Sequence, residues 1–115
     1  FILKNILKGG FVDKTKLPDD YLDLLVPSIK KKGYVYHFRN VLLNYKTWID
    51  CKNIYGSLKS PVNLIYGESD WSTKQERLDS QKKLNLDSHK TISDCGHFSF
   101  LEKPLEVSNI ILSNL

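Results

Sequence analysis

The fold of this chain is decided by residues 94–104, which read DCGHFSFLEKP. Residues 89–93, just before it, form a short β-branched run that is typical of a strand. The proline that ends the stretch suits the start of a helix, which the apolar period predicts over residues 105–115. Gly96 permits a sharp turn, so we expect His97 to project from the carboxyl end of the strand, where open α/β sheets place their chemistry. A histidine there either transfers protons near neutral pH or is a loop residue without a task.

Residues 61–115 are expected to form strand, helix, strand and helix, an α/β pattern. The first strand is predicted over residues 62–66, a short apolar run between a proline and a glycine. The helix is predicted over residues 74–84, and Ser72 and Thr73 before it each have the spacing of a capping box. Two parallel strands joined by a right-handed crossover helix follow from this order.

Residues 1–60 are expected to be helical, with a polar connector at their end. Helices are predicted over residues 1–8, 17–32 and 34–49, and Pro27 is expected to kink or split the second of them. The third has the clearest helical period and an aromatic face. Packing in the core is the default for such a face, and lining an apolar pocket is the alternative. The face consists of Tyr34, Phe38, Val41, Leu42, Tyr45, Trp48 and Ile49.

The composition is that of an ordinary globular domain. The chain has 115 residues, 41% of them hydrophobic and 26% charged, and no apolar run approaches the length of a membrane span. No signal-peptide pattern begins the chain, so we expect a cytoplasmic protein. Cys51 and Cys95 match no metal spacing and indicate a reducing compartment, with one disulfide as the alternative. We expect Cys95 to be a small buried filler, and no cofactor or metal is implied.

The net charge of +4 is concentrated in residues 1–60, which hold eleven of the 17 basic residues and five of the 13 acidic ones. A basic segment could favour anionic ligands or a membrane surface, but lysines on solvated helix faces are the preferred interpretation. Asp13, Asp19, Asp20 and Asp23 interrupt any basic stripe, so nucleic acid is not an expected partner.

One carboxylate and one histidine follow the two predicted strands. Asp70 comes after the first strand and His97 after the second, and parallel neighbours end at the same edge of a sheet. An aspartate hydrogen-bonded to an imidazole fixes its tautomer and stabilises the imidazolium that forms in catalysis. Acid before histidine is also the order that follows a nucleophile elbow. Glu68 is the alternative acid.

These two segments resemble the α/β-hydrolase family. Residues 61–70, PVNLIYGESD, look like its penultimate strand and Gly-x-x-Asp turn, and residues 94–104 look like its Gly-His motif with a following Glu-x-Pro. The resemblance covers residues 61–115 and implies the C-terminal portion of the α/β-hydrolase core. Residues 1–60 would then be the helical cap or lid segment with its connector.

The resemblance also implies residue roles. Asp70 would be the triad acid and His97 the general base. Aromatic side chains would contact an apolar small-molecule substrate; core packing is the other interpretation, and for Trp71 it is the favoured one. The predicted substrate-binding residues are Phe38, Trp48, Trp71 and Phe98.

The chain departs from the family in lacking Gly-x-Ser-x-Gly, because Ser69 and Ser99 lack the flanking glycines. The sequence also contains no methionine. We therefore expect the C-terminal part of a longer hydrolase, with its nucleophile upstream of Phe1 and the missing N-terminal part of the fold as its partner. The isolated chain is expected to be marginally stable or self-associating and inactive.

Three functions fit this interpretation. The first is hydrolysis of an ester, amide or thioester with an apolar acyl or ring portion by an upstream serine. The second is a dehalogenase-like or epoxide-hydrolase-like enzyme with an upstream aspartate nucleophile. The third is a non-catalytic binding module on the same scaffold.

Overall fold

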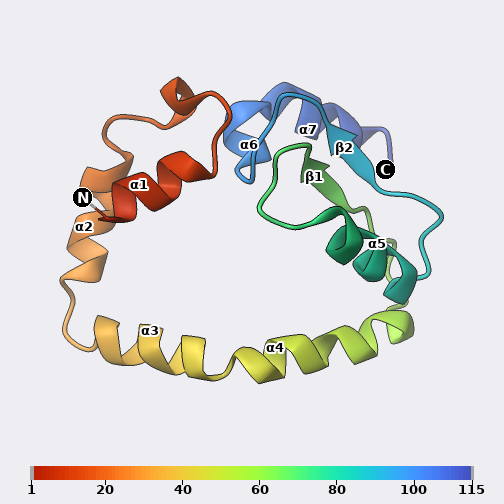
Figure 1. The fold of residues 1–115 in the computed structure, drawn as a ribbon, viewed down its shortest axis with the longest axis horizontal. Helices are drawn as coiled ribbons and strands as arrows, with labels where there is room; N and C mark the ends of the chain where they lie inside the picture. The colour runs from red at the N-terminus through yellow and green to blue at the C-terminus, as the bar shows by residue number, and fades with distance from the viewer. Residues whose placement is uncertain (1, 115) are drawn as a thin grey trace.

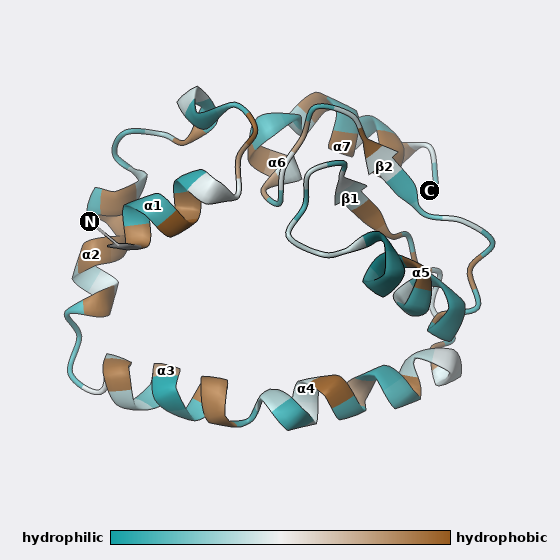
Figure 2. Cartoon of the chain, in the orientation of Figure 1, coloured by the Kyte–Doolittle hydropathy of each residue, from teal (hydrophilic) through white to brown (hydrophobic). Residues whose placement is uncertain are grey.

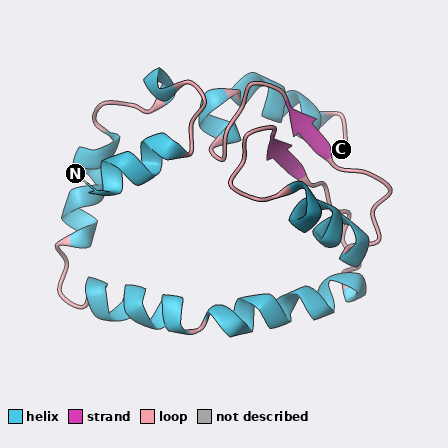
Figure 3. Cartoon of the chain, viewed as in Figure 1, coloured by secondary structure: helices cyan, strands magenta, loops and turns pink. Residues whose placement is uncertain are grey.

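The computed structural model describes residues 2–114, which form a small sheet and a series of helices, several of which lie away from the sheet (Figures 1 and 3). None of the helices in this range is both long and apolar enough to cross a membrane. The elements in chain order are α1 (Ile2–Gly9), η1 (Lys14–Lys16), α2 (Tyr21–Ile29), α3 (Tyr34–Leu43), α4 (Tyr45–Cys51), η2 (Lys52–Ser57), β1 (Ile65–Gly67), α5 (Lys74–Lys83), β2 (Lys90–Ile92), α6 (Ser99–Glu102) and α7 (Pro104–Leu112).

The sheet consists of β1 and β2, which pair in parallel with α5 between them in the chain. The predicted parallel pair is confirmed, but each strand is only three residues long. β1 begins later than predicted and includes Gly67, which pairs with Ile92. Glycine is required there because a Cβ atom at Gly67 would lie 2.0 Å from the carbonyl oxygen of Gly96.

α5 begins with a complete capping box at Thr73. The Thr73 hydroxyl accepts a hydrogen bond from the Glu76 amide, and the Glu76 carboxylate accepts one from the Thr73 amide at 2.7 Å. Of the two predicted caps, Thr73 is therefore confirmed, and Ser72 instead binds Asp70. The last helix begins at Pro104 as predicted.

The predicted helix over residues 34–49 is wrong, because Asn44 divides it into α3 and α4. The Asn44 side-chain amide donates to the carbonyl oxygen of Asn40 at 2.8 Å, and its backbone leaves the helical conformation (φ −86°, ψ 16°). Asparagine favours such local bonds at the expense of helix continuation. Of the two outcomes expected at Pro27, a kink or a split, the split does not occur, since α2 continues through Pro27 and ends two residues later at Ile29.

The aromatic face of residues 34–49 does not pack in a core. Tyr34 is half-buried and the other six residues of this face are exposed, so the core prediction is wrong for this structure. α3 and α4 run along the side of the molecule opposite the sheet (Figure 1), and their apolar residues alternate with polar ones along the helices (Figure 2). The buried apolar residues lie elsewhere, in the loop after α1 and in and after β2; they are Phe11, Leu17, Ile92 and Cys95.

We expect the isolated 115-residue chain to self-associate, because so little apolar surface is buried and the α3–α4 face is uncovered. Its thermal midpoint should depend on protein concentration, and its sedimentation coefficient should rise as concentration rises. Replacing Phe38 and Trp48 by serine should weaken the association without touching the sheet. A sharp, reversible melt with the same midpoint at all concentrations would contradict this expectation.

Candidate active site

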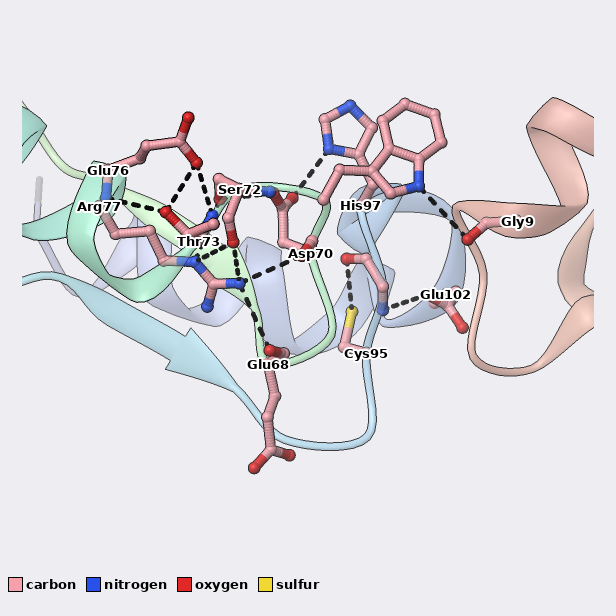
Figure 4. Close-up of polar contacts among 12 residues, drawn as sticks. Gly9, Glu68, Asp70, Ser72, Thr73, Glu76, Arg77, Cys95, His97 and Glu102 are labelled. Carbon is pink, nitrogen blue, oxygen red and sulfur yellow. Dashed lines mark hydrogen bonds and ion pairs between the residues drawn. The ribbon is translucent and has the colours of Figure 1, made fainter.

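Asp70 and His97 meet beyond the carboxyl ends of the two strands. Nδ1 of His97 lies 2.8 Å from Oδ2 of Asp70 (Figure 4). The Asp70 side chain is 8% exposed, whereas the His97 side chain is 41% exposed. The carboxylate is therefore shielded from water behind an imidazole that faces solvent.

The turn after β1 holds the Asp70 carboxylate on its other oxygen. The Ser72 amide and hydroxyl both donate to Oδ1 of Asp70, at 2.7 and 2.6 Å. Burial alone would raise the pKa of Asp70, but the hydrogen bonds from Ser72 and then from His97 outweigh it and lower this pKa below its ordinary value. An ionised carboxylate only accepts hydrogen bonds, so Nδ1 of His97 is the donor and Nε2 is left as the basic nitrogen.

Glu68, the alternative acid, does not contact His97. Its carboxylate accepts the Asp94 amide at 3.2 Å and points away from the imidazole (Figure 4). Asp70 is thus the carboxylate that the fold brings to His97.

Two aromatic side chains surround the imidazole. The Trp71 ring stacks on His97 with centroids 4.1 Å apart and 19° between the planes, and its Nε1 donates to the carbonyl oxygen of Gly9 at 3.3 Å. Trp71 is 51% exposed, so its interpretation as a core residue is wrong. Phe98 contacts both rings edge-on and packs against Phe11 on its other side.

The other two predicted substrate-binding residues lie apart from this cluster. Phe38 and Trp48 are exposed on α3 and α4, on the side of the molecule opposite the strand ends (Figure 1). The structure thus brings Trp71 and Phe98 to His97 but not Phe38 or Trp48.

Glu102, on α6, holds the loop that contains His97, a role that sequence reasoning missed. This side chain is buried, and its Oε2 accepts the Gly96 amide at 2.6 Å. Its Oε1 accepts the amides of Val12 and Asp13 at 2.9 and 2.8 Å. One carboxylate therefore joins the loop after α1 to the loop after β2.

The same two loops also touch through their backbones. The His97 amide donates to the carbonyl oxygen of Gly10 at 2.7 Å. A Cβ atom at Gly96 would lie 2.2 Å from that oxygen, and one at Gly10 would lie 2.5 Å from the Phe98 ring. Gly10, the second glycine of the pair at residues 9–10, permits this contact because it has no side chain.

Arg77, on α5, is the second buried polar residue that sequence reasoning missed. Its guanidinium donates to backbone oxygens in the Asp70 turn and stacks over the Tyr66 ring at 5.3 Å. The signal available in the sequence was one arginine in a helix whose other basic residues are lysines.

The cysteines form no disulfide in this structure, since Cys51 is exposed and Cys95 is buried. Burial and the neighbouring Glu102 carboxylate raise the pKa of the Cys95 thiol to about 11, so it is an unreactive filler as predicted. Within residues 2–114, no group of three or more His, Cys, Asp or Glu side chains is arranged to hold a metal ion.

The chain is similar to Bifunctional epoxide hydrolase 2 of Mus musculus, with 26% identity over 98 residues. The match covers 82% of this chain but only 17% of that relative. No protein-family model matches the chain, and no solved structure matches it. The small parallel sheet is compatible with a fragment of an α/β fold.

We expect Glu102→Gln to destabilise the protein, because the glutamine side chain has one acceptor oxygen where the carboxylate has two. Its NH₂ group would then face backbone N–H groups that bond to the second carboxylate oxygen in the native protein. Leaving buried donors unsatisfied costs roughly 1–3 kcal/mol of unfolding free energy. Urea unfolding measures the change. Glu106→Gln on the exposed side of α7 is the matched control and should leave the unfolding midpoint unchanged. Equal unfolding midpoints for the two variants would show that the Glu102 contacts contribute nothing to the free energy of unfolding.

Proposed function

We propose that this chain belongs to a hydrolase in which His97 is the general base and Asp70 positions it. The observation that supports this is the 2.8 Å contact between Nδ1 of His97 and the shielded Asp70 carboxylate. The proposed substrate is an ester, amide or thioester with an apolar acyl or ring portion. Trp71 and Phe98 provide apolar surface beside the imidazole for such a group.

In the proposed reaction, Nε2 of His97 accepts the proton of a serine hydroxyl while the serine oxygen attacks the carbonyl carbon. The imidazolium then gives this proton to the leaving group, and Asp70 stabilises the positive charge in between. The stacked Trp71 ring adds cation–π stabilisation of the imidazolium. We place the serine upstream of Phe1, because no serine of this sequence lies in Gly-x-Ser-x-Gly.

We further propose that residues 1–60 contain a helical cap and residues 61–115 the C-terminal portion of a hydrolase core. The exposed apolar face of α3 and α4 supports a cap, since such a face suits contact with the rest of a larger fold or with substrate. Phe38 and Trp48 would then reach the substrate only in the whole protein.

We expect His97→Ala in the full-length protein to lower turnover by about a thousand-fold or more, because the nucleophile loses its base. Asp70→Asn should lower kcat strongly as well, since the amide no longer favours the tautomer with a basic Nε2. Steady-state kinetics with short-chain and long-chain aryl esters measure both. His37→Ala, an exposed position on α3, is the control and should keep full activity. Near-normal turnover of His97→Ala would reject the proposal.

A second candidate keeps the pair and changes the nucleophile to an aspartate. It is favoured by one observation, the similarity to a relative named as an epoxide hydrolase. The aspartate oxygen would attack a carbon of an epoxide and break its C–O bond, which gives an alkyl-enzyme ester and an alkoxide that takes up a proton from solvent. His97 would then accept a proton from water as the water oxygen attacks the ester carbonyl, which returns the carboxylate and releases an alcohol.

Covalent labelling of the full-length protein separates the two nucleophiles. We expect a fluorophosphonate to label one upstream serine, because its phosphorus is attacked by an activated hydroxyl. With an aspartate nucleophile, the reagent should not label, and single turnover in heavy-oxygen water should place heavy oxygen in one carboxylate. If neither group is labelled, the non-catalytic binding module is the function that remains.

A further inference from the structure

We propose that Ser72 and Arg77 are positioning residues that fix the Asp70 carboxylate and, through it, the tautomer of His97. The inference rests on the proposed function and deepens it. Neither residue contacts the imidazole, so their effect passes through Asp70.

Arg77 is 5% exposed, yet it makes its hydrogen bonds to the Asp70 turn without a carboxylate partner. Its Nη2 donates to the carbonyl oxygens of Ser72, Asp70 and Glu68 at 2.9, 3.3 and 3.4 Å. These three carbonyls define the turn between β1 and α5 (Figure 4). A buried guanidinium that donates to three carbonyl oxygens fixes the conformation of the backbone that bears them.

Ser72 links this guanidinium to the carboxylate. Nε of Arg77 donates to Oγ of Ser72 at 3.1 Å, and Oγ lies 2.6 Å from Oδ1 of Asp70. Arginine is a donor only, so Oγ must accept from it, and the single hydroxyl proton of Ser72 is directed at Asp70. The Ser72 amide, whose position Arg77 also holds through the Ser72 carbonyl, donates to the same carboxylate oxygen.

The consequence is a directed series of hydrogen bonds. Two donors from Ser72 occupy Oδ1 of Asp70, which leaves Oδ2 to face His97. Rotation of the carboxylate would break both Ser72 bonds at once. Nδ1 of His97 therefore keeps its proton toward Asp70, and Nε2 keeps the lone pair that a general base needs.

The test compares Ser72→Ala with Thr73→Ala in the full-length protein. Both remove one hydroxyl from neighbouring residues, but the Thr73 hydroxyl caps α5 and bonds to Glu76, not Asp70. In Ser72→Ala we expect the pKa of Asp70, measured by carbon NMR, to rise, because its charged form loses a donor. We expect nitrogen NMR of His97 at alkaline pH to show a smaller fraction of the Nδ1–H tautomer. Thr73→Ala should change neither signal.

The kinetic arm should agree with the spectra. Ser72→Ala should lower kcat about ten-fold with little change in KM, since small displacements of a catalytic group reduce the chemical step. Ser72→Thr, which keeps the hydroxyl, should restore the tautomer and the rate. Arg77→Met should reproduce the Ser72→Ala spectra, and combining the two should add little further. If Arg77→Met does not fold, Ser72→Ala alone tests the positioning role.

Unchanged Asp70 and His97 signals in Ser72→Ala would overturn the inference, whatever the rate. Changed signals together with an active His97→Ala would instead uphold the positioning and reject the proposed function.

Discussion

The Glu102 carboxylate is the interaction on which the rest of the structure depends. It accepts three backbone amides, two from the loop after α1, about ninety positions before it in the chain, and one from Gly96, six positions before it. Hydrogen bonds from amides to a carboxylate are stronger than those between neutral groups. Without this shared acceptor, the hydrogen bonds left between the loop that bears His97 and the loop after α1 would be those to the Gly10 carbonyl, beside the packing of Phe11 on Phe98.

The glycines explain why the site residues come so close together. A Cβ atom at Gly67 would overlap the Gly96 carbonyl, and one at Gly96 would overlap the Gly10 carbonyl. Three backbones therefore lie in direct contact, with no side chain between them. Asp70 follows the first of these glycines by three residues, and His97 follows the second by one. Backbone packing therefore sets the distance between Asp70 and His97, and their side chains form a hydrogen bond across it.

Local signals in the sequence predicted the elements that local interactions make. The parallel pairing of β1 and β2, the Thr73 capping box, the helix start at Pro104 and the meeting of Asp70 with His97 all follow from short patterns and strand topology. The contacts of Glu102, Arg77 and Gly10 were not predictable, because nothing near these residues in the sequence indicates their partners. The aromatic period of residues 34–49 marked an apolar face, but a period says nothing about what covers that face.

Arg77 and Glu102 are both buried, and they do not pair with each other but bind main-chain groups. A guanidinium paired with a carboxylate would satisfy two side chains and leave the nearby backbone to other partners. Here the guanidinium binds carbonyls of the Asp70 turn, and the carboxylate binds amides of the His97 loop and the loop after α1. Each charged group therefore fixes one of the two loops that meet at the site. The contact between Asp70 and His97 joins two loops that are each already held from behind, which is the condition for an exposed imidazole to keep one orientation.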